Sequence, residues 1–307
     1  MAPDINHENN SRPAHTSPCT PRGNLCAGNS LYFAASGITN AGGRCDQQED
    51  ACYYSATAGL FIVSDGIGGT QAGGLASQIT VQALPSKILE ACARRDGEAP
   101  EHCHARARMV GVMIDAVKEV LLEKTRTHPA TKGLGATVVA AYYIGGGQMA
   151  LSHLGDSRAY LLRNSVLERL TEDHTLANML YLTGQITHEQ MKDHPGCNIL
   201  TRHIGMAECP DAEVMLLSIR PGDRLLLCTD GLTGVVGDAE LGALLTCDEN
   251  PAATCHALLA AAQAANAQDN ITALVVDVLP RPGPINPGGV VTLCKEVGSS
   301  LTPLTKS

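Results

Sequence analysis

The sequence predicts an α+β fold built on antiparallel strands, and three observations support this prediction. Short apolar runs of strand length recur along the chain and are separated by turn residues. Several of the links between them are only a few residues long, which makes neighbouring strands antiparallel. Longer stretches with a helical spacing of apolar residues are inserted between these runs.

Seven apolar runs have the length and composition of strands. Gly145-Gly146-Gly147, Asn164-Ser165 and Arg220-Pro221-Gly222-Asp223 are typical of tight turns between adjacent strands. The predicted strands cover residues 60–63, 137–143, 149–154, 158–162, 213–219, 224–228 and 272–279.

Three stretches are predicted as helices that cover the outside of the strands. Residues 72–95 include Pro85, which we expect to kink the helix or to open a second one. Residues 251–268 are rich in alanine and follow Asn250, which is suited to cap the first turn. In residues 104–127 one apolar stripe is formed by Met109, Val112, Met113, Ala116, Val117, Val120 and Leu121.

Composition places the chain among globular proteins and excludes some functions. Apolar residues make up 44% of the 307 residues and charged residues 17%, which is enough to build a sizeable core. The core must be aliphatic, because the chain has no Trp and only two Phe. Few aromatic rings and a net charge of −9 argue against nucleic-acid binding, whereas an acidic balance fits a cation binder.

The two ends are predicted to be loose extensions of one domain that covers residues 31–280. Residues 1–30 and 281–307 have no hydrophobic period. The uncharged stretch 133–152 is broken by three consecutive glycines, so we expect a hairpin there and no membrane insertion. No signal peptide and no CxxC pair are recognised among the twelve cysteines, which favours a cytoplasmic location.

Two distant segments each deliver a carboxylate from the end of a buried strand. Asp65 and Asp230 follow apolar runs, and each precedes a glycine that allows a sharp turn and the close approach of a carbonyl to a cation. Asp269 precedes the last predicted strand, and Asp156 lies between two others. Converging carboxylates repel one another unless hard cations neutralise them, so Mg²⁺ or Mn²⁺ is expected. For any single Asp-Gly pair, the alternative interpretation is that it forms an ordinary turn and binds no metal.

Over roughly residues 31–279 the ordered motifs resemble the metal-dependent protein phosphatases of the 2C type, in their compact bacterial form. The segment Gly155-Asp156-Ser157-Arg158 carries the strongest likeness. The other matching segments are Arg44 with Gln48-Glu49-Asp50, Ser64-Asp65-Gly66-Ile67-Gly68-Gly69, Gly135-Ala136-Thr137, Leu170-Thr171-Glu172-Asp173-His174-Thr175, Asn198-Ile199-Leu200-Thr201-Arg202, Cys228-Thr229-Asp230-Gly231-Leu232 and Asp269-Asn270-Ile271-Thr272.

The resemblance implies a four-layer αββα sandwich, in which two antiparallel sheets pack face to face between outer helices. It implies two Mg²⁺ or Mn²⁺ ions and a third that is held more weakly. Asp65, Asp230 and Asp269 would act in catalysis through a water that the ions activate, and Arg44 would clamp the substrate phosphate. The implied metal ligands are Asp65, the Gly66 carbonyl, Asp230, Asp269, Glu49, Asp50 through water, and Asp156 at the third ion.

The implied reaction is the hydrolysis of phosphoserine and phosphothreonine esters in proteins. The enzyme would oppose a Ser/Thr kinase, act as a monomer, and carry a flap over its site at about residues 175–206. Two alternatives remain open: a pseudophosphatase or regulatory binding module that uses the same surface, and a hydrolase of small phosphate esters. A zinc site among His174, His188, His194 and His203 is disfavoured, because their spacing is irregular.

Two positions depart from the family pattern. The segment from Arg44 to Glu49 is one residue longer than usual and has Gln48 in place of Asn, so the role of Arg44 is the least secure. Ile67 stands where many eukaryotic members have His, and an isoleucine cannot donate a proton.

We predict that removal of residues 1–25 and 285–307 leaves hydrolysis of a small phosphate ester intact, because these segments lack the apolar period needed to join a core. Turnover and thermal melting of the truncated protein test this. Loss of folding would contradict the prediction, whereas an effect on protein substrates alone would assign the ends a targeting role.

Overall fold

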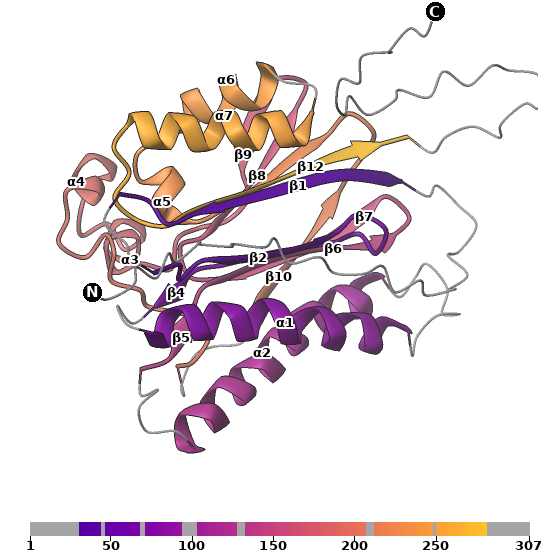
Figure 1. Cartoon of the computed structure of the whole chain (residues 1–307), viewed down its shortest axis with the longest axis horizontal. Helices are drawn as coiled ribbons and strands as arrows, with labels where there is room; N and C mark the ends of the chain where they lie inside the picture. Colours follow the sequence, from indigo (N-terminus) through magenta and orange to yellow (C-terminus); the bar gives the residue numbers. More distant parts are fainter. Residues whose placement is uncertain are drawn as a thin grey trace, which may run out of the picture.

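The computed structural model describes residues 31–43, 47–67, 71–93, 103–127, 133–206, 212–247 and 250–280. The terminal extensions that were predicted from the sequence lie outside these ranges. Within them, two five-stranded antiparallel sheets pack face to face, with helices on both outer faces (Figure 1). This is the predicted α+β arrangement.

The first sheet has the strand order β1-β12-β11-β8-β9. It consists of β1 (Tyr32–Asn40), β12 (Ile271–Leu279), β11 (Arg224–Cys228), β8 (Arg158–Arg163) and β9 (Val166–Arg169). Helices α6 (Asp238–Cys247) and α7 (Pro251–Ala264) cover its outer face, and Asn250 caps α7 as predicted.

The second sheet has the order β10-β7-β6-β3-β2. It consists of β10 (Glu213–Ser218), β7 (Gln148–Leu154), β6 (Val138–Gly145), β3 (Leu60–Ser64) and β2 (Ala51–Ser55). Helices α1 (Gln71–Ala93) and α2 (Cys103–Thr127) cover its outer face. Among the described residues, no helix is long and apolar enough to cross a bilayer.

Three apolar clusters fill the three spaces between the four layers. Strand β3 serves two of them, because successive side chains of a strand point to opposite faces. Leu60 and Ile62 pack towards α1 and α2, whereas Phe61 and Val63 pack between the sheets. In the first sheet, Leu226 belongs to the third cluster, beneath α6 and α7. The central strands are therefore buried on both faces, which explains their nearly continuous apolar sequence.

The predicted buried stripe of α2 is only partly right: its residues Val117 and Leu121 are buried, but two others are exposed. Val112 is 52% exposed and Val120 is 39% exposed. The helix has apolar residues around much of its circumference. The spacing of these residues in the sequence is therefore compatible with more than one choice of buried face. Packing against α1, β7 and β10 selects the face. The buried apolar residues of that face are Ala107, Val110, Ile114, Val117 and Leu121.

Other differences concern short elements and one proline. Helix α1 continues through Pro85 and does not open a second helix there. The prediction of three helices missed α6, because a short run of apolar residues does not distinguish a helix from a strand. Strands β1, β2 and β9 were also missed, and their side chains are mostly only half-buried.

Several strands end or begin at one end of the sandwich. The register pairs Ala51 with Ser64, Val138 with Leu154, and Cys228 with Ala273. The short elements β4 (Gly66–Ile67), β5 (Gly135–Ala136), α3 (Leu176–Leu182), α4 (His188–Lys192) and α5 (Asp230–Thr233) gather at this end, on the left in Figure 1.

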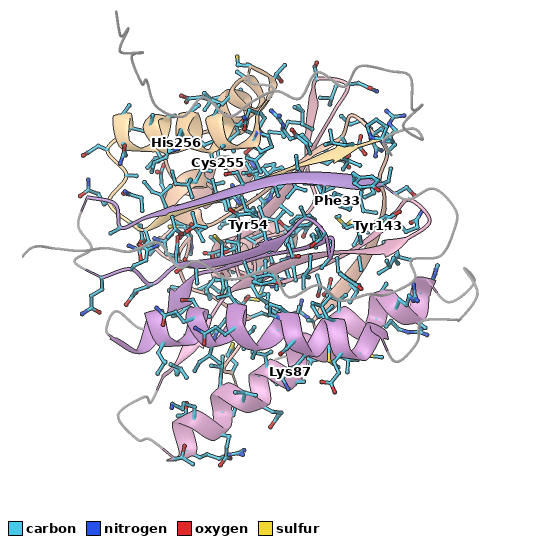
Figure 2. The ribbon with its side chains drawn as sticks, turned by 45° about the vertical axis from the view of Figure 1, so that its right-hand side comes forward. Phe33, Tyr54, Lys87, Tyr143, Cys255 and His256 are labelled. Atoms are coloured by element: carbon cyan, nitrogen blue, oxygen red, sulfur yellow. The ribbon has the colours of Figure 1, made fainter. Side chains whose placement is uncertain are left out.

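Aromatic packing lies towards the opposite end of the sandwich. The ring of Phe33 contacts Phe61 and Tyr143 edge to face, with centroids 5.5 and 5.3 Å apart. Figure 2 shows Phe33 and Tyr143 on the two facing sheets. Packing of this kind stabilises the fold and leaves free the end of the sandwich where the short elements gather.

Candidate metal centre

The acidic residues singled out in the sequence converge at the end of the sandwich where these strands meet. Asp65 follows β3, Asp230 opens α5 directly after β11, and Asp269 precedes β12. Asp50 precedes β2, and Asp156 lies in the link between β7 and β8. Strand pairing within each sheet and the packing of the two sheets on each other thus bring together residues that are far apart in the sequence.

Thr137 fixes the main chain of the residue that is central to the cluster. The Asp65 N–H donates to Thr137 Oγ1 at 2.9 Å, and the Thr137 N–H donates to the Asp65 carbonyl at 2.8 Å. The Thr137 hydroxyl also lies 2.6 Å from the Ser157 hydroxyl, next to Asp156. One threonine therefore links the loop of Asp65 to the loop of Asp156.

Gly66 stands where a side chain has no room. A Cβ atom on it would lie 2.1 Å from the Gly73 carbonyl oxygen and 2.8 Å from that of Glu49. The Gly66 N–H donates to the Glu49 carbonyl at 3.1 Å, and the Ser77 hydroxyl donates to the same oxygen. The glycine thus permits close packing of β4 on α1 and on the segment that carries Glu49.

Asn270 holds the segment that carries Glu49. Its side-chain oxygen accepts the Glu49 N–H at 2.5 Å, and its Nδ2 donates to the carbonyls of Ala41 and Gln47 at 2.9 and 3.2 Å. Asn270 is buried, and its neighbour Asp269 accepts its N–H at 2.8 Å. Its amide therefore sets the position of Glu49 relative to Asp269.

Thr229 performs a similar task for Asp50. The Thr229 hydroxyl donates to Asp50 Oδ2 at 2.8 Å and accepts the Thr272 N–H at 3.0 Å. Because the backbone N–H can only donate, the hydroxyl proton is directed at the carboxylate. Asp50 is 4% exposed, so this hydrogen bond fixes the orientation of a buried acid.

The carboxylates differ in exposure but lie close to one another. Asp50 and Asp156 are buried, Asp65, Asp230 and Glu49 are half-buried, and Asp269 is exposed. The pKa values of the more enclosed acids reflect this. Burial, followed by the charges of Asp50, Asp230, Asp156 and Asp269, raises the pKa of Asp65 well above its usual value. Burial likewise raises the pKa of Asp50 to about 7 against hydrogen bonds from Thr272 and Thr229, and that of Asp230 to about 6.

The same two causes act on the outlying acids. Burial, followed by the charge of Asp230, raises the pKa of Asp156 to about 8. Glu49 has its pKa raised by burial and then by the charge of Asp269. Neutralising cations would remove the mutual repulsion of these groups.

The donor set fits hard divalent cations. Asp50 Oδ1 and Asp230 Oδ1 are buried without a hydrogen-bond partner, so each has an oxygen available to a ligand. Carboxylate and carbonyl oxygens are the ligands that Mg²⁺ and Mn²⁺ prefer. In the described part of the chain, no three acidic, imidazole or thiol side chains stand in a ready-made metal cage. Ions of this type keep several waters, which allows the carboxylates to stand apart.

Two predictions from the sequence remain to be compared with the structure: the role of Arg44 and the disfavoured zinc site among four histidines. Arg44 lies outside the described residues, so its predicted role is neither supported nor opposed here. The histidines of the flap form no metal cluster with one another within the described ranges. His174 instead stacks on His153, with ring centroids 4.6 Å apart.

Sequence reasoning missed the residues that hold the carboxylates in place. Thr137, Thr229 and Asn270 all lie inside the recognised motifs, but no role was assigned to them. A polar residue within an apolar strand end is the signal that could have found them, because buried polar groups require partners.

The chain is similar to bacterial serine/threonine phosphatases. A family model described as "Protein phosphatase 2C" matches residues 41–273. The serine/threonine phosphatase stp of Listeria innocua is 33% identical over 218 residues, which cover 71% of this chain and 84% of that protein. The serine/threonine protein phosphatase PstP of Mycobacterium tuberculosis is 32% identical over 231 residues, which cover 75% of this chain and 42% of that protein.

Solved structures agree with these sequence matches. The crystal structure of the Mycobacterium tuberculosis phosphatase PstP/Ppp has a TM-score of 0.70 and 29% identity, covering 81% of this chain and all of that one. The PstP catalytic domain in complex with two manganese ions gives the same values. Staphylococcus aureus Stp1 has a TM-score of 0.70 and 28% identity, covering 83% of this chain and 98% of that one.

We predict that Asp65→Asn stabilises the metal-free fold at pH 8 by a few degrees in Tm, because it removes a buried charge from the cluster. About 1 kcal/mol corresponds to about 2–4 °C for a domain of this size. The raised pKa values mean that the folded wild type binds more protons than the unfolded chain. The contribution of these acids to stability is therefore fully present below the ordinary carboxyl pKa of about 4 and is lost as pH rises through about 6–8.

Thermal melts in chelator across pH 5–8 test this prediction, with the exposed-site variant Asp193→Asn as control. The difference between Asp65→Asn and wild type should shrink as pH falls. An Asp65→Asn variant that melts below wild type at pH 8 would show that the cluster is not under electrostatic stress.

Proposed function

The chain belongs to the protein phosphatase 2C family, and on that basis we propose that it removes phosphate from phosphoserine and phosphothreonine in proteins with the help of two Mn²⁺ or Mg²⁺ ions. The observation that supports this proposal is the convergence of carboxylates from separate strand ends, two of which have a buried oxygen left available to cations. When bound, such ions supply an activated water as the nucleophile and neutralise charge on the phosphoryl oxygens.

The residue assignments are proposals that follow the family motifs. Asp65, Asp230 and Asp269 would hold one ion, and Asp65 would be shared with a second that also takes the Gly66 carbonyl and Glu49. The unpartnered oxygen of Asp230 and the central position of Asp65 in the charge cluster support these assignments.

Two acids would act less directly. Asp50 would orient water at the ions, which is supported by its unpartnered Oδ1 and by the hydrogen bond that fixes its other oxygen. Asp156 would hold the third, weaker ion, because it stands in a separate loop yet still senses the charge of Asp230.

The chain's own groups prepare the site for in-line attack. Thr137, Thr229 and Asn270 hold Asp65, Asp50 and Glu49 in fixed orientations, so little reorganisation accompanies the reaction. Arg44 would clamp the substrate phosphate through the fork of its guanidinium. Ile67 supplies no proton to the leaving alkoxide, so that proton must come from another group or from water.

Wider features of the function are also proposals. The substrates are phosphorylated proteins, and we propose that the enzyme opposes a Ser/Thr kinase and works as a monomer in the cytoplasm. Residues 31–280 would form the catalytic domain, with the flap at about 175–206.

We expect phosphate release from a phosphothreonine peptide in the presence of Mn²⁺ and none in the presence of a chelator. Asp65→Asn, Asp230→Asn and Asp269→Asn should each lower turnover by about 10²–10⁴-fold, since each removes a negative ligand and several kcal/mol of transition-state stabilisation are at stake. Malachite-green detection of phosphate measures this, with Glu119→Gln on the exposed side of α2 as the control. Near wild-type turnover in any of the three variants would refute its assignment.

We predict that Thr229→Val raises the Mn²⁺ concentration for half-maximal activity by about 10-fold, whereas Thr229→Ser stays close to wild type. Valine keeps the shape but leaves Asp50 Oδ2 and the Thr272 N–H without their partner, and groups that orient ligands typically contribute 10–100-fold in metal affinity. Activity and calorimetric binding are titrated with Mn²⁺. Equal Mn²⁺ dependence in the two variants would exclude this role of the hydroxyl.

A further inference from the structure

Strand β9 forms an outer edge of the first sheet, and among the described residues no strand pairs with the side that faces away from β8. Just after β9, the Leu170 N–H donates to the Ala159 carbonyl at 2.8 Å. Main-chain groups alternate in direction along a strand, so the N–H and C=O groups of Leu167 and Arg169 point away from β8. Val166 in β9 is 67% exposed. The edge therefore presents hydrogen-bonding groups and apolar surface to which a further strand can add.

The opposite edge of the same sheet is less open. Strand β1 forms that edge, and it lies against β2 of the second sheet. A Cβ atom on Gly37 in β1 would lie 3.2 Å from Cys52 Sγ and 3.2 Å from the ring of Tyr54, both in β2. These two edge strands together close one side of the sandwich, so β9 is the accessible edge of the first sheet.

A groove lies beside β9, between this strand and α6. Leu167 lines it from the strand, and α6 contributes residues three or four apart, which share one face of a helix. These residues are Ala239, Gly242, Ala243 and Thr246. A Cβ atom on Gly242 would lie 3.6 Å from the Leu167 Cβ atom, so a larger side chain at this position would occupy the groove. Small and apolar groups thus leave room for the side chains of a strand added to β9.

The described part of the chain ends close to one end of this groove. Ser165 lines the groove from the turn between β8 and β9, and Arg163 just before that turn is forked on Asp223 at 2.8 and 2.6 Å. The Asp223 carbonyl in turn accepts the Val278 N–H at 2.9 Å. Strand β12 therefore ends at the same end of the sheet as the turn that opens β9.

The length of chain that follows is sufficient to reach β9. Three strand spacings of about 4.8 Å separate β12 from β9 in the order β12-β11-β8-β9, which amounts to about 14 Å. Ten residues, from Pro280 to Val290, span up to about 33 Å when extended. Any segment from residue 290 onwards can therefore lie along β9.

The composition of this segment suits the edge. Val290-Val291-Thr292-Leu293 is a run of β-branched and apolar residues that matches the length of β9, although residues 281–307 as a whole have no hydrophobic period. The charges are complementary as well. Exposed carboxylates lie on β9 and on the first turn of α6, whereas residues 281–307 carry three basic side chains and one acidic one. These groups are Glu168, Asp238 and Glu240 on the domain, and Arg281, Lys295, Lys306 and Glu296 on the segment.

We propose that residues 290–293 of this chain dock on β9 as an additional strand of the first sheet, with the side chains that face α6 seated in the groove. Because the segment is joined to the same chain, its effective concentration at the edge is high and a small interface is sufficient. An added strand also covers an edge that would otherwise be open to pairing with other molecules.

Two variants break the docking from opposite sides, and each has a matched control. Gly242→Leu fills the groove without weakening α6, because leucine favours a helix more than glycine does. Ala253→Leu makes a comparable change at an exposed position of α7, away from the groove. Val291→Asp places a charge within the apolar run, and Ser300→Asp adds the same charge outside it.

Hydrogen exchange is measured by NMR on the full-length protein, at the amides of β9 and of residues 290–293. In wild type and in both controls, we expect the Leu167 and Arg169 amides and residues 290–293 to exchange at least about 10-fold more slowly than in Gly242→Leu and in Val291→Asp. The Glu168 amide points towards β8 and should exchange equally in all five proteins.

Several results would overturn the inference. Residues 290–293 that exchange as fast in wild type as in Val291→Asp would show that the segment is not docked. A change at residues 290–293 without one at Leu167 and Arg169, or the reverse, would show that the segment and the edge are not partners. Protection of Leu167 and Arg169 that disappears on tenfold dilution would assign the edge to a second copy of the chain, because docking within one chain is independent of concentration.

Discussion

The mutual repulsion of closely placed, partly buried carboxylates is the constraint on which the acidic end of this protein depends. Asp65 lies at its centre, within the influence of four other acids, and its pKa is raised accordingly. Chains usually avoid such a cluster, because each charge loses hydration and opposes its neighbours. A site of this kind is unfavourable when empty and favourable once dications enter, so binding of the ions and ordering of the site are thermodynamically linked.

The sandwich supplies the rigidity that this arrangement requires. Three apolar clusters hold the four layers together, and the strands that end in acids are buried on both faces. Short side chains then complete the positioning: Thr137, Thr229 and Asn270 each direct hydrogen bonds at the main chain or carboxylate of an acidic residue or its neighbour. Stability therefore resides in the layers, whereas the acidic end retains the electrostatic stress that metal binding relieves.

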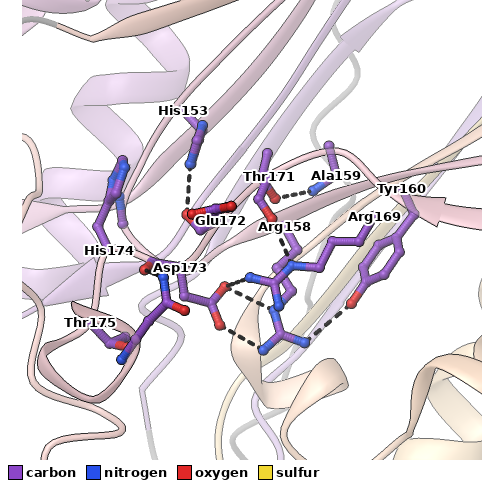
Figure 3. A network of polar contacts seen from close by, with 12 residues as sticks. His153, Arg158, Ala159, Tyr160, Arg169, Thr171, Glu172, Asp173, His174 and Thr175 are labelled. Atoms are coloured by element: carbon purple, nitrogen blue, oxygen red, sulfur yellow. Dashed lines mark hydrogen bonds and ion pairs between the residues drawn. The ribbon is translucent and has the colours of Figure 1, made fainter. Parts of the chain in front are cut away.

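The network around Asp173 follows the same logic: Arg158 donates to both of its carboxylate oxygens, and the Gly155 N–H donates to its neighbour His174 (Figure 3). Oppositely charged groups that would contribute little on the surface are shielded here and joined to main-chain hydrogen bonds on both sides. The main-chain segments on both sides of this network therefore share Asp173 and His174 as hydrogen-bond partners.

The sequence by itself determined the fold class, the family and the acids that meet at one end of the sandwich, because Asp-Gly after a buried strand places a carboxylate at the turn where the strand ends. Tertiary structure alone decided which face of α2 is buried, since Val112 and Ile114 are equally apolar and only packing against α1, β7 and β10 distinguishes them. It also decided the partners of Thr229 and Asn270 and the tie between Gly155 and His174. Local sequence could not reveal these contacts, because each joins segments that only the pairing of strands and the packing of the two sheets bring together.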